Sequence, residues 1–499
     1  MYTWLSYTNL FYENGLILNG ADLLRPFWFV ILAIISHPYH WLSSILQIEL
    51  ISINTLPTSM DPGWGIQYIP DPIFNYLVKT PMILGDTGVT LSLYKLGQYY
   101  GRDSGNKAAM MYYLNPAIIW ISSSWGQYDS LPVMLAIFSI YLIIRSRPTL
   151  SSISLLGATM LKWYAFAPII PITVYLIKNK EKIHLIKFFV PIITIGLIYG
   201  ILIPIDSLQT IVKFLSPWIN AESGISGFGL TYWSTSLLYP ISIELSSTIY
   251  IIAFLTFGIT TLVAICLLKT KKALDFFVVA NILLALTFFL SYRYVTEQRF
   301  VWLASFLILL VVGGRLNGKI FWSMSILAII YAQKNFPHYL LPIEYFTSGT
   351  IHPLFIVTET MRTVQEGALM PTGVSALILT VLGSSFSILS LIVYFKSVRP
   401  VLTQSYINMN SIPKVLVSKS RVVMSYLKGN MGAPFVGAFI IILSAIIISL
   451  AIGKGEGIDE MLTYAYYLLV IGIILQLITY LRHSWKKDTK KEKTEITQE

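Results

Sequence analysis

The chain has few charged residues for its length. Only 12% of its 499 residues are Asp, Glu, Lys or Arg, whereas soluble globular proteins carry about 25%. Hydrophobic residues make up 55%, and apolar runs reach the roughly 20 residues that cross a bilayer. Such runs cover residues 247–268, 371–395, 434–452 and 461–481. The sequence therefore predicts an all-α polytopic protein, a multi-pass integral protein of the cell membrane in contact with membrane lipids.

Cysteine and nucleotide-binding loops are also scarce. Cys266 is the only cysteine, which excludes an intrachain disulfide and a cysteine metal cluster. No Gly-rich phosphate loop is visible, so no nucleotide cofactor is expected. His37 and His40 lie one helical turn apart, but Pro38 interrupts that turn and no carboxylate follows at ligand spacing, so we expect no metal. Residues 1–14 lack the basic start and apolar core of a signal peptide.

Positive charge is in excess, with a formal net charge of +11. A nucleic-acid partner would explain such an excess, but the Lys and Arg residues gather at the ends of apolar runs and in the tail. That placement is typical of membrane orientation signals, which keep short basic loops in the cytoplasm. We therefore expect no nucleic-acid partner. The predicted cytoplasmic clusters lie near residues 95–107, 145–147, 178–187, 269–272, 315–319, 396–428 and 482–493.

If these clusters are all cytoplasmic, the segments between them must cross in pairs. Residues 108–122 and 130–144 then form a hairpin with an outward tip at 124–129, and 273–290 and 300–312 form another with a tip at 291–299. Residues 320–331 run outward and 371–395 return, while 434–452 and 461–481 form a last hairpin.

The run 150–177 does not fit this scheme, because it is too short for two crossings. It carries Lys162 near its middle, and Pro168 and Pro171 follow. This pattern predicts two short half-helices that enter and leave on one side. Their broken backbone would have to be buried in protein or line a wet cavity. The earlier run 27–48, interrupted by His37-Pro-Tyr-His40, is either one span or two short interfacial helices.

Several motifs resemble those of a known family. Asn115-Pro116, the turn Trp125-Gly-Gln-Tyr-Asp129 and the following Pro132 resemble the GT-C superfamily of membrane glycosyltransferases, most closely its lipid-phosphate-sugar-dependent mannosyltransferase branch. Three further stretches, residues 79–86, 159–168 and 294–303, are similar to other motifs of that family, and the four stretches occur in the family's order. The resemblance covers about residues 64–310.

The resemblance implies a GT-C-like bundle of roughly a dozen transmembrane helices with short outward-facing helices and loops. It implies transfer of a hexose, such as mannose, from a polyprenyl-phosphate-linked donor to a lipid-linked or membrane-anchored acceptor on the outer face. The expected divisions are outward-facing loop and interfacial helices (1–71), GT-C-like core (72–333), outward loop (334–370), C-terminal transmembrane helices (371–481) and cytoplasmic basic tail (482–499).

The chemistry of such a transfer requires cations for the departing phosphate, which gains charge as the glycosidic bond breaks. Lys162, Arg293 and Arg299 map to the outer rim and are the candidate phosphate ligands, with Gln298 as a neighbouring contact. The alternative is that the two arginines only extend to the membrane interface.

Two residues of the first outward turn are candidates for substrate binding. Gln127 and Asp129 could orient sugar hydroxyls or cap the helix that begins near Pro132.

A carboxylate must also deprotonate the acceptor hydroxyl. In the family this acid follows the first transmembrane helix. Residues 1–12 look like the sequence just after it, so we expect an incomplete start or a relocated base. A second family arrangement would place the acid at Gln67, which cannot act as a base. Asp61 is the first candidate for the catalytic base and Asp71 is the second. Asp22 and Glu13 rank after these two.

Two of the acidic residues have simpler interpretations. Asp61-Pro-Gly is also an ordinary turn sequence. Asp86, inside the predicted crossing 72–96, is expected to pair with a polar neighbour rather than perform chemistry.

Two other classes of protein remain open. A transporter or flippase of lipid-linked sugar also uses broken helices and intramembrane charges, although it predicts two similar halves and the motifs do not recur after about residue 310. A non-catalytic GT-C-like membrane protein is the third possibility.

Overall fold

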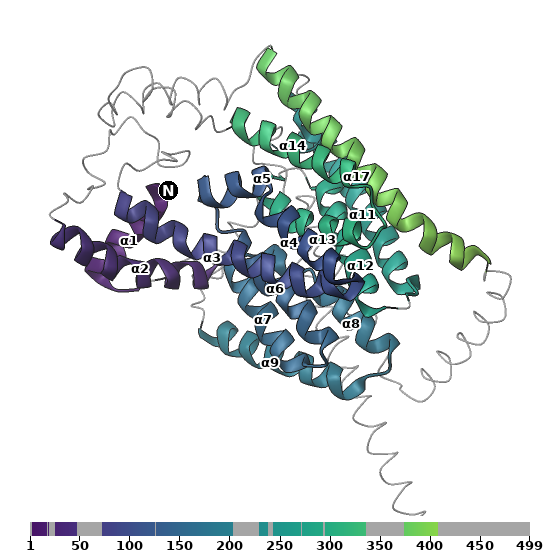
Figure 1. Cartoon of the computed structure of the whole chain (residues 1–499), viewed down its shortest axis with the longest axis horizontal. Helices are drawn as coiled ribbons and strands as arrows, with labels where there is room; N and C mark the ends of the chain where they lie inside the picture. The colour runs from purple at the N-terminus through teal and green to yellow at the C-terminus, as the bar shows by residue number, and fades with distance from the viewer. Residues whose placement is uncertain are drawn as a thin grey trace, which may run out of the picture. The chain divides into compact units, whose positions relative to one another are not determined.

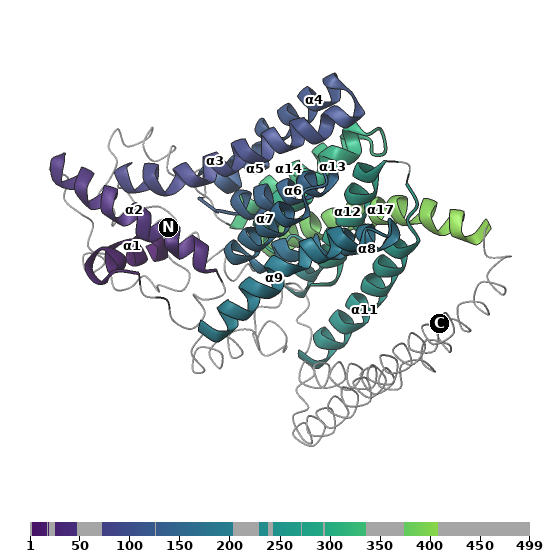
Figure 2. The ribbon, with the colours of Figure 1, turned by 90° about the horizontal axis from the view of Figure 1, so that it is seen from below.

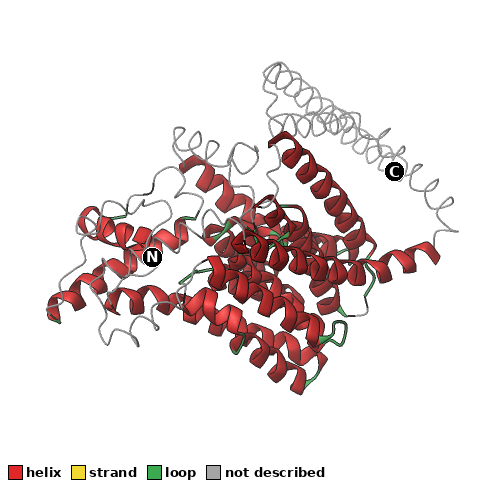
Figure 3. Ribbon diagram, turned by 90° about the horizontal axis from the view of Figure 1, so that it is seen from above, coloured by secondary structure: helices red, strands yellow, loops and turns green. Residues whose placement is uncertain are grey.

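The computed structural model describes residues 2–16, 18, 25–46, 72–124, 126–202, 229–237, 243–270, 272–292, 295–335 and 374–407. The chain forms two compact units, Met1–Leu215 with Ser223–Leu402, and Ser216–Glu222 with Thr403–Glu499. Apart from residues 403–407, all described residues belong to the first unit. Within the described ranges every regular element is a helix and no strand occurs (Figure 3).

Figure 1 labels the longer helices in the order of the chain. The first part contains α1 (Tyr2–Asn14), α2 (Pro26–Ile45), α3 (Pro72–Gly97), α4 (Arg102–Tyr113), α5 (Pro116–Ile119), α6 (Ser130–Ile144), α7 (Pro148–Leu161), α8 (Ile169–Lys178) and α9 (Lys182–Leu202). The second part contains α11 (Ile243–Leu267), α12 (Ala273–Ser291), α13 (Phe300–Val312), α14 (Gly318–Asn335) and α17 (Val374–Ile407). Short helical turns lie at Gln98–Tyr100, Trp120–Ser124, Trp163–Phe166, Tyr232–Leu237 and Glu297–Arg299.

Among the described residues, four segments are long and apolar enough to cross a membrane: Lys182–Tyr199, Ile249–Leu267, Ala273–Ser291 and Ala376–Val401. They indicate a membrane protein, which agrees with the predicted all-helical class, but they do not confirm roughly a dozen spans. Only 6% of the segment in α9 is buried inside the structure, whereas 78% of the segment in α12 is buried. A largely exposed apolar helix of this length suits contact with lipid.

The interior of the unit is formed by α12 and α13, and every residue from Phe300 to Val311 is buried. A helix that is apolar on all sides is buried on all sides, and α13 packs against α12, α4 and α14. Hydroxyl groups connect the neighbouring helices: Thr261 Oγ1 lies 2.7 Å from Thr287 Oγ1 and 3.0 Å from the Tyr394 hydroxyl. Such contacts join apolar helices that gain little from hydrophobic burial in lipid.

The predicted segments 130–144 and 300–312 match α6 and α13 residue for residue. The predicted segment 108–122 is not one helix, because the chain breaks between α4 and α5. Pro116 lacks an N–H and disfavours helical backbone in the preceding residue. The Asn115 side chain caps α5 by accepting hydrogen bonds from Ala117 N and Ile118 N, and it donates to Ser325 Oγ at 2.9 Å.

The expected break within 150–177 is confirmed. Helix α7 ends at Leu161, Lys162 is extended (φ −150°, ψ 127°), and the turn Trp163–Phe166 leads into α8. The described part of the earlier run 27–48 forms one helix up to Ile45, α2, which continues through Pro38.

Residues from the predicted cytoplasmic clusters meet at one end of the bundle. The Tyr100 hydroxyl donates to Asp275 Oδ1 at 2.7 Å, and Arg315 pairs with Asp275 Oδ2 at 2.6 Å. Nearby, Lys178 Nζ donates to the Leu268 carbonyl at 2.6 Å. These contacts bring together the ends of α8 and α11, the start of α12 and the chain that follows α3 and α13. Such a meeting is what we expect if the segments between the basic clusters cross in pairs. The compartment that this end faces stays a prediction.

Several expected segments lie outside the described residues. They are most of the outward loop 334–370, the hairpin 434–452 and 461–481, and the tail 482–499. The predicted crossing 371–395 is described from Val374 and belongs to the longer helix α17.

Candidate functional site

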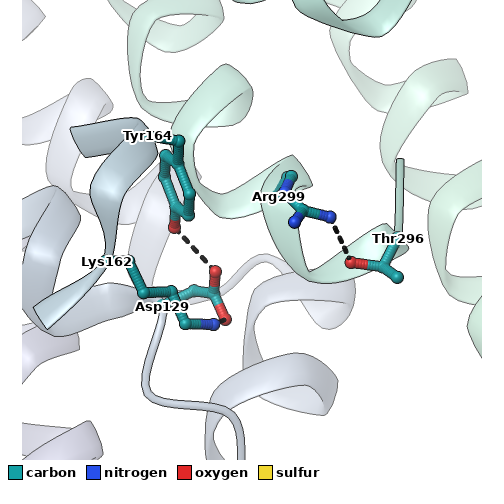
Figure 4. Close-up of polar contacts among 5 residues, drawn as sticks. All are labelled: Asp129, Lys162, Tyr164, Thr296 and Arg299. Atoms are coloured by element: carbon teal, nitrogen blue, oxygen red, sulfur yellow. Dashed lines mark hydrogen bonds and ion pairs between the residues drawn. The ribbon is translucent and has the colours of Figure 1, made fainter. Parts of the chain in front are cut away.

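The centre of the candidate site is the carboxylate of Asp129, which is fully buried. Its Oδ2 accepts a hydrogen bond from Lys162 Nζ at 2.5 Å and its Oδ1 accepts one from the Tyr164 hydroxyl at 2.6 Å (Figure 4). Asp129 directly precedes α6, yet its side chain makes no capping bond. The capping alternative for Asp129 is therefore wrong, because the carboxylate turns to the α7–α8 break. Contact of Asp129 with a sugar hydroxyl stays a prediction.

The turn that carries Asp129 depends on two glycines. Gly126 has a φ of +80°, a conformation that costs other L-residues free energy. Gly85 of α3 lies so close to α6 that an added Cβ would come within 2.9 Å of Ser130 Oγ and 3.0 Å of Leu131 N. This close approach lets Ser130 Oγ donate to the Met82 carbonyl at 3.0 Å, which anchors the start of α6 on α3.

Arg299 enters the same cluster from the turn Glu297–Arg299. Its Nη1 donates to Thr296 Oγ1 at 3.0 Å (Figure 4). The guanidinium carbon lies 5.9 Å from the ring centre of Tyr164 and 5.4 Å from that of Phe288, within cation–π range. The two predicted outward tips, 124–129 and 291–299, are thus brought together with Lys162, although they are far apart in the sequence.

A third cation, Arg25, was missed by the sequence reasoning. Its guanidinium carbon lies 5.6 Å from the ring centre of Trp4 and 5.4 Å from that of Phe29. It is within electrostatic range of both Tyr128 and Lys162. One signal could have revealed it: a basic residue in a segment expected on the outer side runs against the positive-inside rule.

Not every predicted site residue is placed. Asp61, Asp71, Asp22 and Arg293 lie outside the described residues, so the identity of the base stays a prediction. Glu13 is exposed on α1.

Two predicted substrate ligands flank the cluster in the sequence. Gln127 and Gln298 are half-buried and directly precede Tyr128 and Arg299, respectively. Their roles in substrate binding stay predictions.

Asp86 pairs with polar neighbours, as expected. Its carboxylate accepts hydrogen bonds from Ser122 Oγ and from the Tyr112 hydroxyl, the latter at 3.2 Å. It thereby connects α3 to the turn Trp120–Ser124 that leads toward Asp129. His40, one of the two histidines considered for a metal, stacks on Tyr12 with ring centres 3.8 Å apart and lies 3.2 Å from Asn9 Oδ1.

No protein-family model matches this sequence, and no curated protein is detectably similar to it. The resemblance to GT-C glycosyltransferases therefore depends on the motifs alone.

Proposed function

We propose that the chain is a multi-pass glycosyltransferase of the cell membrane. It would transfer a hexose, such as mannose, from a polyprenyl-phosphate-linked donor to a lipid-linked or membrane-anchored acceptor on the outer face. The observation that carries this proposal is the cluster in which Asp129, Lys162 and Arg299 come together from two turns and a broken helix. Charged groups inside a membrane protein are expensive and usually functional.

The cluster suits the departing phosphate of such a reaction. In the transfer, a carboxylate removes the proton from the acceptor hydroxyl, whose oxygen bonds to the sugar carbon. The bond from that carbon to the phosphate oxygen breaks, and the electron pair stays on the phosphate. Lys162 has three N–H donors, and one reaches Asp129, so the others can approach a phosphate oxygen. Arg299 adds a planar donor group, whose guanidinium carbon lies 5.9 Å from the ring centre of Tyr164. Asp61 and Asp71 remain the proposed bases.

A transporter or flippase of lipid-linked sugar is the second candidate, because the backbone is broken at Lys162. Discontinuous helices with charges at the break also form transport sites.

A single preparation can separate the two functions. The purified chain is placed in lipid vesicles with a polyprenyl-phosphate hexose that carries a radioactive sugar, and sugar transfer and transbilayer movement of the intact donor are both measured. We expect label in a new lipid and free polyprenyl phosphate, both strongly reduced in Lys162→Ala. Movement of intact donor without transfer would instead identify a transporter.

A further inference from the structure

Three of the membrane-length segments have one end each beside α8. The segment Lys182–Tyr199 begins there, Ile249–Leu267 ends there and Ala273–Ser291 begins there. Lys178 Nζ, in the last turn of α8, donates to the carbonyl of Leu268, the residue directly after the second segment, at 2.6 Å. Helix α8 packs against α9, α11 and α12 (Figure 1, Figure 2). Because segments of this length reach from one surface of a bilayer to the other, their shared end lies at the level of the lipid headgroups.

Lysines gather at this shared end. The two connections that form it, residues 178–187 and 268–275, contain seven lysines and two acidic residues. Five of the lysines are exposed and lie close to the ends of the helices, and we call them the lysine cluster: Lys178, Lys180, Lys182, Lys269 and Lys272. None of the five forms an ion pair with another described residue.

The two acidic residues of these connections are held by other partners. Glu181 Oε2 lies 2.7 Å from His184 Nδ1, and Asp275 Oδ2 lies 2.6 Å from the Arg315 guanidinium. The lysine cluster is therefore a positively charged surface that the acids of its own connections do not neutralise.

Lys180 occupies a backbone position that favours glycine. Its φ is +59°, in the left-handed region that costs residues with a Cβ free energy. Lys180 N donates to the Ile177 carbonyl at 3.1 Å, and Glu181 N donates to the Leu176 carbonyl at 3.0 Å. These bonds end α8 in the turn that glycine usually completes. A charged side chain thus stands where glycine would fit the backbone better.

The surroundings of the lysine cluster select a lipid rather than a soluble anion. Only 6% of the membrane-length segment in α9 and 17% of that in α11 is buried inside the structure, so lipid lies directly against both helices. Basic clusters next to a membrane segment attract anionic phospholipids. A lysine ammonium has three N–H donors, and a lipid phosphate offers oxygens that accept them.

We propose that the lysine cluster binds the headgroup phosphates of anionic phospholipids in the adjoining leaflet. The lipid would join the end of α8, the start of α9 and the end of α11 by contacting lysines from each. This binding does not depend on glycosyl transfer, and it takes place at a different part of the molecule from Asp129 and Lys162.

The proposal can be tested with the full chain in detergent micelles, by native mass spectrometry with added lipid. Phosphatidylglycerol and phosphatidylcholine with the same acyl chains are compared, and we expect the parent chain to bind phosphatidylglycerol more tightly. Lys182→Gln and Lys269→Gln should each weaken phosphatidylglycerol binding about fivefold, which corresponds to about 1 kcal/mol per lysine, and leave phosphatidylcholine binding unchanged. Lys107→Gln is the matched control, because it removes an exposed lysine from α4, which packs against α3 and α13. It should change the binding far less.

Lys180→Gly separates charge from folding. The substitution removes the charge and relieves the backbone, so phosphatidylglycerol should bind about fivefold more weakly while the Tm in detergent without added lipid does not fall. A fall in both quantities would overturn the assignment of Lys180 to the lipid site.

The remaining outcomes each decide one part of the proposal. Equal affinity of the parent chain for the two lipids would overturn it, and so would parent affinity for phosphatidylglycerol in both glutamine variants. Displacement of phosphatidylglycerol by inorganic phosphate at the same concentration would overturn the choice of a lipid. Selective binding of phosphatidylglycerol by a chain that transfers no sugar would support the lysine cluster and reject the proposed glycosyl transfer.

Discussion

Replacing Asp129 by Asn tests the ion pair at the centre of the site. The substitution keeps the shape of the side chain, and the amide oxygen can still accept from the Tyr164 hydroxyl. The Lys162 ammonium, however, loses its partner while Arg25 and Arg299 still repel it. Removing one partner of a buried pair costs about 3–5 kcal/mol. Because the Lys162 side chain keeps 17% of its exposure, water offsets part of this, and we expect a loss of about 2–4 kcal/mol.

The reasoning is checked by a double-mutant cycle. The free energy of unfolding is measured by denaturant titration of the full chain in detergent micelles for Asp129→Asn, Lys162→Met and the double variant. If the loss comes from an uncompensated charge, the double variant should be more stable than the sum of the single losses predicts, by about 1–3 kcal/mol. Purely additive losses would refute the argument, because the two side chains would then contribute independently of each other.

Three further predictions concern the proposed reaction and its orientation. Lys162→Ala should lower the rate of sugar transfer far more than Lys162→Arg, because the positive charge beside the phosphate is what matters; equal rates for Lys162→Ala and the parent would remove Lys162 from the mechanism. Asp61→Asn should lower the rate by at least about a hundredfold with donor binding retained, and Asp71→Asn should lower it less; parent rates in both would place the base elsewhere. A cysteine introduced at Arg299, which is half-buried, should react with an impermeant thiol reagent applied to intact cells and one at the exposed Arg145 should not, and labelling at Arg145 would reverse the assigned topology.

The sequence predicted correctly those helices whose ends are marked by neighbouring residues in the chain. Helices α6 and α13 were predicted to the residue because each is an uninterrupted apolar run between polar turns. The break at Lys162 was predicted because a cation within an apolar run and prolines soon after it both disfavour a continuous helix. The break at Asn115-Pro116 was not predicted, although the same proline rule applies there. The cap by Asn115 and its bond to Ser325 form only in the folded chain.

The candidate site could be predicted only in part, because its partners are distant in the sequence. Lys162 and Arg299 were expected near a phosphate from charge and topology, and the structure places both beside Tyr164. The bond of Lys162 to Asp129 was not expected, since turn sequences favour capping at such a position. Arg25 was missed because nothing local connects it to Tyr128. Its position follows from the apolar packing of α1 and α2 against α3.

The same packing explains why small residues matter for the position of charged ones. Asp129 can meet Lys162 only if the start of α6 lies against α3. The α6 backbone approaches α3 closely at Gly85, where an added Cβ would come within 2.9 Å of Ser130 Oγ and 3.0 Å of Leu131 N. The bond from Ser130 to the Met82 carbonyl then fixes the first turn of α6. Met82 is also part of the apolar cluster that positions α2 and therefore Arg25. The short stretch of α3 that contains Met82 and Gly85 thus helps to position both the Asp129 carboxylate and the Arg25 guanidinium. The charges of the site therefore depend for their positions on the packing of uncharged residues between helices.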